Sequence, residues 1–172
     1  MLRRMGTAGM AAVEFALVLP ALLALVFGSI EVTNILIVRS DVANLTSSAA
    51  DLVAQESTVS DADMTNVFNA LTALVFPYST TGAKIVITSV IDDGHGGGKV
   101  AWSDAYNGTA RTVGTSVTVP TGLITAGGST VMAEVTYNYA TPSSYLIKVP
   151  VSMSNTFYSH PRRVAQIART HP

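Results

Sequence analysis

The apolar positions of this chain are concentrated near its amino terminus. From Met10 to Val38 only two residues, Glu14 and Glu31, are ionisable, and the stretch 15–30 has none. A helix over residues 10–30 has a length of about 31 Å at about 1.5 Å per residue, which matches the hydrocarbon core of a bilayer. The pattern therefore predicts a membrane-spanning helix within residues 10–38.

The charges that flank this segment predict its orientation. Arg3 and Arg4 precede it and Arg39 follows it, and positive side chains favour the cytoplasmic side of a membrane. We therefore expect a cytoplasmic amino terminus, with everything after residue 40 outside the inner membrane. Glu31 is expected near the outer interface, where water solvates its charge.

Apolar residues continue beyond the membrane segment at helical spacing. They recur at intervals of 3, 4, 3, 4 and 3 residues, at Ile35, Val38, Val42, Leu45, Ala49 and Leu52. This stripe predicts that the helix runs on to about Gln55, which gives a total length on the order of 70 Å. For residues 42–55 we expect packing against the protein's own domain rather than a free stalk.

A second amphipathic helix is predicted after residue 60. Ser60 provides an N-cap, and Asp63 stands three positions on, where a capping box carries its second member. The apolar residues expected on one face of this helix, as core contacts, are Met64, Val67, Phe68, Leu71, Leu74 and Val75. The helix is expected to end before Pro77.

The hydrophobic period changes from 3.6 to 2 from Lys84 onward. Residues 84–91 predict a strand, 92–98 a turn rich in Gly, and 99–103 the second strand of a hairpin. Residues 130–139 alternate in the same way, and a last strand is expected at about 147–158. The predicted fold class is α+β: a long amino-terminal helix, a second amphipathic helix and an antiparallel sheet of about four strands.

Composition narrows the function classes. The formal net charge is −1 and only 12% of the residues are charged, against about 25% in a typical soluble domain, while the mean hydropathy is +0.40. These values favour a membrane segment attached to one domain, exclude a disordered charged tail and provide no basic face for nucleic acid. The absence of cysteine rules out disulfides, thiolate zinc sites, iron–sulfur clusters and a cysteine nucleophile.

Glu14 is the unexpected residue of the apolar segment, because a carboxylate at the bilayer centre costs roughly 2.5 to 3.5 kcal/mol. A cut after Gly9 leaves it as the fifth residue of a chain that begins at Met10. This arrangement resembles a class III prepilin signal, and the resemblance implies that the new ammonium of one chain meets the Glu14 carboxylate of its neighbour. The two charges would neutralise each other in an apolar bundle, and their pairing would select axial register. A protonated or snorkelling side chain near the interface is the simpler alternative.

This pattern resembles a class III prepilin signal, in which a membrane-embedded aspartyl peptidase cuts after the Gly. The segment AAVEFALVLP at 11–20, followed by FG at 27–28 and by Glu31, is similar to the opening of TadE/TadG-like proteins, the minor pseudopilins of the tight-adherence (Tad/Flp) pilus system. The segments EVTYNY at 134–139 and FYSHPR at 157–162, with a Pro142 loop between them, resemble the closing strands of the same proteins more loosely.

The resemblance implies a division of the chain and roles for individual residues. The division is a leader at 1–9, a transmembrane helix at 10–38 and an extracytoplasmic α+β, pilin-like head at 39–172. Gly9 and Met10 would flank the cut made by the prepilin peptidase, and Glu14 and Phe15 would act in subunit assembly. Packing of the membrane helix would involve Leu17, Leu19, Pro20, Leu23 and Phe27.

The resemblance also implies partners and a location. The partners are a prepilin peptidase, other Tad pilins or pseudopilins and the pilus assembly platform. The location is the bacterial inner membrane, with the head in the periplasm or on the extracellular pilus. The protein would take part in assembly of a Tad/Flp type IVb pilus, be incorporated in it or prime it for adhesion. From the residues themselves we expect no enzymatic activity, cofactor or metal, because the sequence has no G-x-S-x-G motif and no EF-hand spacing.

Two polar clusters in the head are weaker candidates for chemistry. Asp92, Asp93 and His95 lie in a Gly-rich loop, but no EF-hand spacing follows and the other histidines are far away in sequence, so a solvated turn is favoured over a metal site. A basic end contains His160, Arg162, Arg163 and Arg169. It would suit acidic partners or lipid headgroups, although a solvated tail is the favoured interpretation.

Two rival functions come from other classes. A membrane-anchored binding or adhesin domain that never polymerises would use residues 10–38 only as an anchor. A secreted binding protein with an ordinary signal peptide would be cut near Gly28, but Glu14 argues against this because the apolar region of such signals is normally uncharged.

Overall fold

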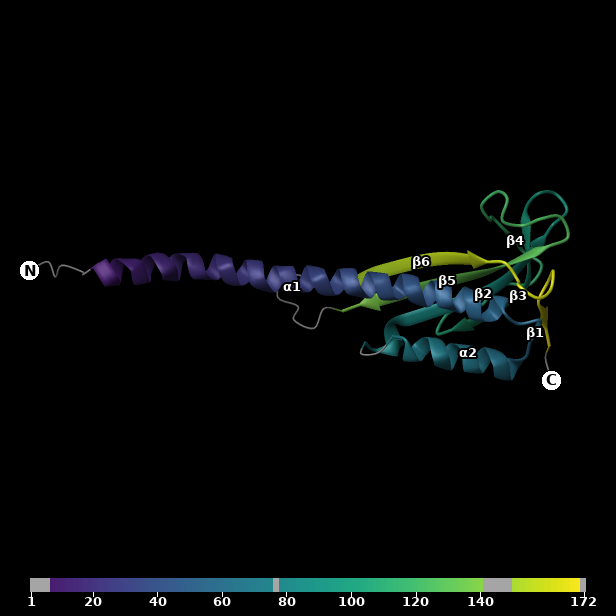
Figure 1. Ribbon diagram of the computed structural model, residues 1–172, viewed down its shortest axis with the longest axis horizontal. Coiled ribbons are helices and arrows are strands. Elements are labelled where there is room, and N and C mark those ends of the chain that lie inside the picture. Colours follow the sequence, from purple (N-terminus) through teal and green to yellow (C-terminus); the bar gives the residue numbers. More distant parts are fainter. Residues whose placement is uncertain (1–6, 76–77, 141–149, 171–172) are drawn as a thin grey trace, which may run out of the picture. The chain divides into compact units, whose positions relative to one another are not determined.

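The computed structural model describes residues 7–75, 78–140 and 150–170, and it begins with one α-helix, α1, from Thr7 to Ala54 (Figure 1). The predicted single long helix is confirmed, with a length of roughly 72 Å at about 1.5 Å per residue. Pro20 lies inside α1 and does not end it. The chain divides into two units, Met1–Ile37 with Ala140–Pro150, and Val38–Tyr139 with Val151–Pro172. We call the second unit the head.

The second predicted helix is α2, from Asp61 to Ala73, and its amino end carries a complete capping box. The backbone N–H of Asp63 donates to Ser60 Oγ at 3.3 Å, and the backbone N–H of Ser60 donates to Asp63 Oδ2 at 2.9 Å. These two bonds satisfy amide groups that a helix start otherwise leaves without partners. The Ser60 hydroxyl also donates to Asp63 Oδ2 at 2.7 Å, and this bond, together with the one from the Ser60 amide, holds the pKa of the Asp63 carboxyl below its usual range.

The main sheet of the head has five antiparallel strands in the order β4-β3-β2-β5-β6. The strands are β2 (Ala83–Asp92), β3 (Gly98–Tyr106), β4 (Ser116–Val117), β5 (Ser129–Tyr139) and β6 (Val151–Ser159). The four long strands confirm the predicted α+β fold, and the short β4 adds a fifth. The last strand begins at 151, whereas it was expected from about 147; residues 141–149 lie outside the described part.

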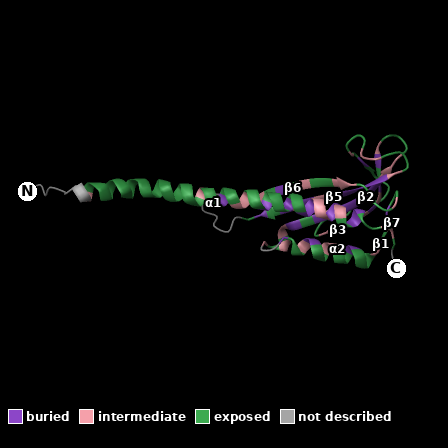
Figure 2. Cartoon of the chain, in the orientation of Figure 1, coloured by how far each residue is buried: buried purple, intermediate pink, exposed green. Residues whose placement is uncertain are grey.

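Both helices of the head pack on one face of this sheet, which we call the helix-covered face. Tyr106, Ile85 and Val135 are in register across β3, β2 and β5 and therefore share that face. The Phe68 ring of α2 lies 6.0 Å from the Tyr106 ring. Figure 2 shows that burial in α1 is concentrated in its carboxyl-terminal part, which belongs to the head.

The opposite face, which we call the outer face, carries a second and smaller core. Val90, Val100, Val117 and Met132 form it, and partly buried side chains from residues 119–124 and from β6 pack against it. The connection between β3 and β5 covers this cluster because β4 pairs with the start of β3. Met132 shares this face with polar residues of β5 such as Glu134 and Thr136, and it is nevertheless only 2% exposed.

The predicted burial of the apolar stripe on α1 is confirmed at four positions and is wrong at the last one. Four of the residues predicted to face the domain are buried: Val38, Val42, Leu45 and Ala49. Leu52, however, is 38% exposed, whereas Val53 is completely buried. A strict 3.5-residue repeat drifts around a straight helix of 3.6 residues per turn, so the buried face has moved by one residue at the last turn.

On α2 one of the six predicted core residues is also misplaced. Met64, Leu71 and Val75 are buried and Val67 and Phe68 are half-buried, but Leu74 is 57% exposed. Helix α2 has already ended at Ala73, so the helical periodicity that assigned Leu74 to the core no longer applies there.

The carboxyl-terminal residues 160–170 are bound to the head, which corrects the prediction of a solvated basic tail. The indole Nε1 of Trp102 donates to the carbonyl of Ile167 at 2.8 Å, and the backbone N–H of Arg162 donates to the carbonyl of Ala54 at 2.9 Å. The segment then forms β7 (Ala168–Arg169), which pairs in parallel with β1 (Thr58–Val59). Backbone pairing across more than a hundred residues of sequence has no local signal.

Candidate assembly segment

The site residues predicted in the first unit all lie in the amino-terminal part of α1. From Met10 to Phe27 every described side chain is exposed, including Phe15 at 60% and Leu17 at 76%. Soluble proteins rarely expose so large a continuous apolar surface, and such a surface marks contact with lipid or with other proteins. Within the described residues α1 is the one helix long and apolar enough to cross a membrane.

On α1 the predicted residues lie in rows, and successive residues of one row are four positions apart in the sequence. Phe15, Leu19, Leu23 and Phe27 form a row of large side chains. A neighbouring row holds small residues and the proline: Ala12, Ala16, Pro20, Ala24 and Gly28. Rows at this spacing are the ridges and grooves by which helices interlock, and small residues let the backbones of membrane helices approach closely. Leu17 lies outside both rows.

The hydroxyl groups of the segment are satisfied within the helix. Ser29 Oγ donates to the carbonyl of Val26 at 2.8 Å, and Thr33 Oγ1 donates to the carbonyl of Ser29, also at 2.8 Å. These bonds remove the cost of placing the hydroxyls in apolar surroundings.

Glu14 differs from these hydroxyl groups. Its carboxylate is exposed, and it has no hydrogen bond or ion pair with any residue in 7–75, 78–140 or 150–170. Met10 stands one turn before it on α1. The structure therefore presents an apolar helical surface that contains one uncompensated carboxylate close to the predicted cleavage junction.

Glu31 does not have the environment expected from the sequence. We placed it at a hydrated interface, but its side chain is only 3% exposed. Protein atoms rather than water therefore surround this carboxylate.

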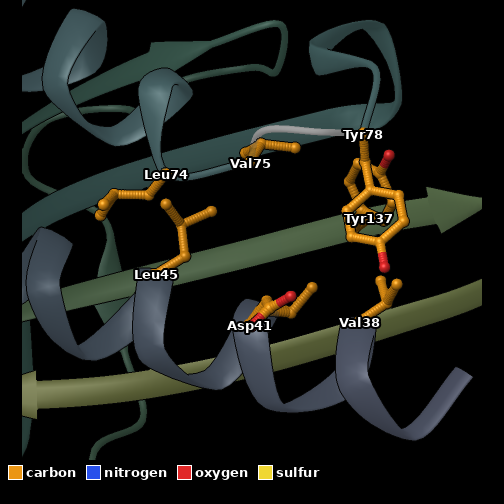
Figure 3. Close-up of a pocket in the computed structure, with 8 residues that line it drawn as sticks. Val38, Asp41, Leu45, Leu74, Val75, Tyr78 and Tyr137 are labelled. Carbon is orange, nitrogen blue, oxygen red and sulfur yellow. The ribbon is translucent and has the colours of Figure 1, made fainter. Parts of the chain in front are cut away.

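An apolar crevice lies in the head where α1 enters it, and sequence reasoning did not identify it (Figure 3). Its lining comes from α1, from the residues after α2 and from β5, and consists of Val38, Asp41, Val42, Leu45, Leu74, Val75, Tyr78 and Tyr137. The hydroxyl of Tyr137 donates to the carbonyl of Ser79 at 3.0 Å, and burial raises the pKa of this phenol. The exposed Leu74 is part of this crevice, which explains an apolar side chain outside the core.

The carboxylates of the Gly-rich hairpin turn organise the turn itself. Asp93 Oδ1 accepts hydrogen bonds from the backbone N–H groups of His95 at 2.7 Å and Gly97 at 2.8 Å, which lower the pKa of its carboxyl. Asp92 accepts from the backbone N–H groups of Gly94 and Gly127, both at 3.0 Å. Asp side chains commonly stabilise turns in this way, so the geometry agrees with the interpretation as a turn.

Residues 9–51 match the family model described as TadE-like protein. The amino-terminal segment of this chain is therefore similar to TadE-like proteins. The match confirms the resemblance found in residues 11–31, and it covers one quarter of the chain, beginning at Gly9 and reaching into the part of α1 that packs on the head. No curated protein and no solved structure matches the chain.

The TadE-like segment supports involvement in the tight-adherence pilus system, and its apolar helix is compatible with membrane anchoring. The matched region contains every residue that the sequence assigned to cleavage, assembly and helix packing. The looser resemblance of residues 134–162 lies outside it and stays a prediction.

Proposed function

We propose that this protein is a TadE-like minor pseudopilin that acts in assembly of a Tad/Flp type IVb pilus. The role is structural, and no enzymatic step is assigned to any residue. The observation that carries the proposal is the match of residues 9–51 to the TadE-like family on a helix whose side chains from Met10 to Phe27 are exposed and mostly apolar.

Residues 10–38 would insert in the inner membrane, with the amino terminus in the cytoplasm and the head in the periplasm. The apolar length of about 31 Å supports one crossing. The satisfied hydroxyls of Ser29 and Thr33 support it as well, because a helix in hydrocarbon needs its polar groups bonded internally. After assembly the head would be carried on the extracellular pilus, where it would prime adhesion.

Maturation by a prepilin peptidase would cut between Gly9 and Met10 and create an ammonium group at Met10. Glu14 would pair with the new amino terminus of the next subunit, since a buried carboxylate is unfavourable alone and is stabilised by an opposite charge. Phe15 and the row that continues through Phe27 would pack against neighbouring helices. Other Tad pilins and the assembly platform would therefore be the partners of this segment.

The proposal is tested by locating the protein after its host system assembles pili. We expect part of the wild-type protein in sheared pili, Glu14→Asp in the same fraction, and Glu14→Ala confined to the membrane. A membrane-anchored binding domain that never polymerises predicts all three proteins in the membrane only. That result, obtained while the major pilin is assembled normally, would overturn the pseudopilin assignment.

A further inference from the structure

A polar groove on the outer face of the sheet has no part in the assembly function proposed above. It has a volume of about 500 Å³, is partly open to solvent, and lies between β2, β5 and the connection that follows β3. Its lining is Lys84, Val86, Asn107, Gly108, Thr109, Arg111, Glu134 and Thr136. The space is within the range of about 300 to 1,000 Å³ found for small-molecule sites.

The guanidinium of Arg111 is fixed in this groove by the carboxylate of Glu134. Arg111 Nε donates to Oε2 at 3.0 Å, and Nη2 donates to Oε1 at 2.8 Å and to Oε2 at 2.9 Å. The backbone N–H of Arg111 also donates to Ser103 Oγ at 3.1 Å. The pair raises the pKa of Arg111, and it leaves Nη1 without a partner among the residues that the structure describes.

Lys84 provides a second cation beside this pair. It lies opposite Thr136 in the β2–β5 register, while Val86 lies opposite Glu134, so Lys84 and Glu134 are diagonal neighbours on the outer face. The Lys84 side chain is exposed and forms no ion pair or hydrogen bond within the described part of the chain. Its ammonium is therefore available to a ligand.

The connection after β3 forms the wall of the groove at a strained backbone position. Asn107 has a φ of 49°, in the left-handed region that residues other than glycine rarely adopt. Gly108 follows it beside β2, where an added Cβ would be in ordinary contact with Val86 Cγ2 at 3.4 Å. Backbone strain of this kind is often found at binding sites, and here it places Asn107 and Thr109 along the groove.

The charges and polar groups define the chemistry of a fitting ligand. Two cations, Lys84 and Arg111, and one anion, Glu134, leave a single positive charge. This balance suits a monoanionic carboxylate, whereas the adjacent Glu134 disfavours a phosphate dianion. Amide, hydroxyl and carboxylate groups from Asn107, Thr136 and Glu134 supply both donors and acceptors for hydroxyl groups.

We propose that this groove binds acidic saccharides, that is, sugars that carry a carboxylate. The carboxylate of the sugar contacts Lys84 and Nη1 of Arg111, and the sugar hydroxyls contact Glu134, Thr136 and Asn107. Binding is selective for the acid, because a neutral sugar offers no anionic group to the Lys84 ammonium or to Nη1 of Arg111. The site acts whether or not the protein polymerises.

Titration calorimetry on the full chain in detergent micelles tests this proposal, with trigalacturonate as the probe. We expect saturable binding of trigalacturonate, and about tenfold weaker binding or none for its methyl ester, since one charge-assisted contact is worth about a factor of ten. Lys84→Gln should weaken binding by a similar factor, and Thr136→Val by less. The matched control is Lys99→Gln, an exposed lysine on β3 of the same sheet that does not line the groove.

Any of three results with trigalacturonate and its methyl ester would overturn the proposal. They are no binding of trigalacturonate to the folded wild-type chain, equal binding of the acid and its methyl ester, and equal binding by wild type and Lys84→Gln. A triglutamate peptide that competes as strongly as trigalacturonate would also overturn it, because the groove would then recognise acidic peptides. Circular dichroism of Lys84→Gln establishes folding independently, and pilus incorporation is measured separately, so failure here leaves the assembly proposal intact.

Discussion

Arg169 and Asp104 form a two-point ion pair that fastens the carboxyl-terminal segment to the sheet. Arg169 Nε donates to Asp104 Oδ2 at 2.9 Å and Nη2 donates to Oδ1 at 3.0 Å, and the same guanidinium also pairs with Asp61 at the start of α2. The Arg169 side chain is only 7% exposed. One residue near the end of the chain thus connects β3, α2 and β7.

We predict that Arg169→Ala lowers the free energy of unfolding of the head by about 3 kcal/mol, because it leaves the partly buried Asp104 carboxylate without its partner. Urea unfolding of the full chain in detergent micelles measures this, with the single tryptophan, Trp102, as the fluorescent probe. Arg163→Ala is the control, since Arg163 is exposed, and it should change stability by no more than about 0.5 kcal/mol. Equal effects of the two variants would show that the ion pairs of Arg169 contribute nothing to the stability of the head.

The two leucines at the end of α2 provide a matched test of the core. Leu71 is completely buried and Leu74 is 57% exposed. Leu71→Ala should therefore cost about 2 to 5 kcal/mol of stability through lost burial and a residual cavity, and Leu74→Ala about 0.5 kcal/mol or less. The same urea titration decides between them. If Leu74→Ala were as destabilising as Leu71→Ala, the packing assigned to this end of α2 would be wrong.

The hairpin turn predicts a pH dependence of stability. Hydrogen bonds from two backbone amides lower the pKa of the Asp93 carboxyl in the folded state. A lowered folded-state pKa stabilises the protein above the unfolded pKa of about 3.9, and this contribution is lost as the pH falls through the folded value. Asp93→Asn should therefore be less stable than wild type by a constant amount from about pH 5 to 7, and the difference should shrink below about pH 4.

Thermal unfolding midpoints of wild type and Asp93→Asn across this pH range measure the difference directly. His95→Ala leaves the backbone donor at residue 95 in place, so its difference from wild type should not shrink at low pH. A stability difference between wild type and Asp93→Asn that grows as the pH falls would contradict the assigned bonding.

The hydrophobic pattern predicted the helices and long strands of this chain, because those of the head each bury one continuous face and the first part of α1 is one apolar run. The period of 3.6 identified α1, the Ser60 and Asp63 pair identified the start of α2, and the alternation in 130–139 identified β5. The two residues wrongly assigned to the core are Leu52 and Leu74. Leu52 is exposed because a 3.5-residue repeat drifts away from the buried face of α1, and Leu74 is exposed because α2 ends one residue before it.

The features that sequence reasoning missed depend on contacts between distant segments. Arg169 forms ion pairs with Asp104 and Asp61, and the apolar crevice is lined by residues from three segments. The outer groove depends on the pair of Arg111 with Glu134, which lie 23 residues apart in the sequence. None of these contacts leaves a local pattern, since the residues are individually ordinary. The amino-terminal segment was predictable because its residues are consecutive and because Glu14 stands out in an apolar run.

The mature amino terminus of the membrane-bound protein tests the pseudopilin account most directly. Intact mass should be measured on wild type, Gly9→Val and Gly6→Val, each expressed with and without a cognate prepilin peptidase. We predict that wild type and Gly6→Val lose residues 1–9 only when the peptidase is present, and that Gly9→Val stays uncut. An uncut wild-type chain in the presence of an active peptidase, or a cut near Gly28, would contradict the account.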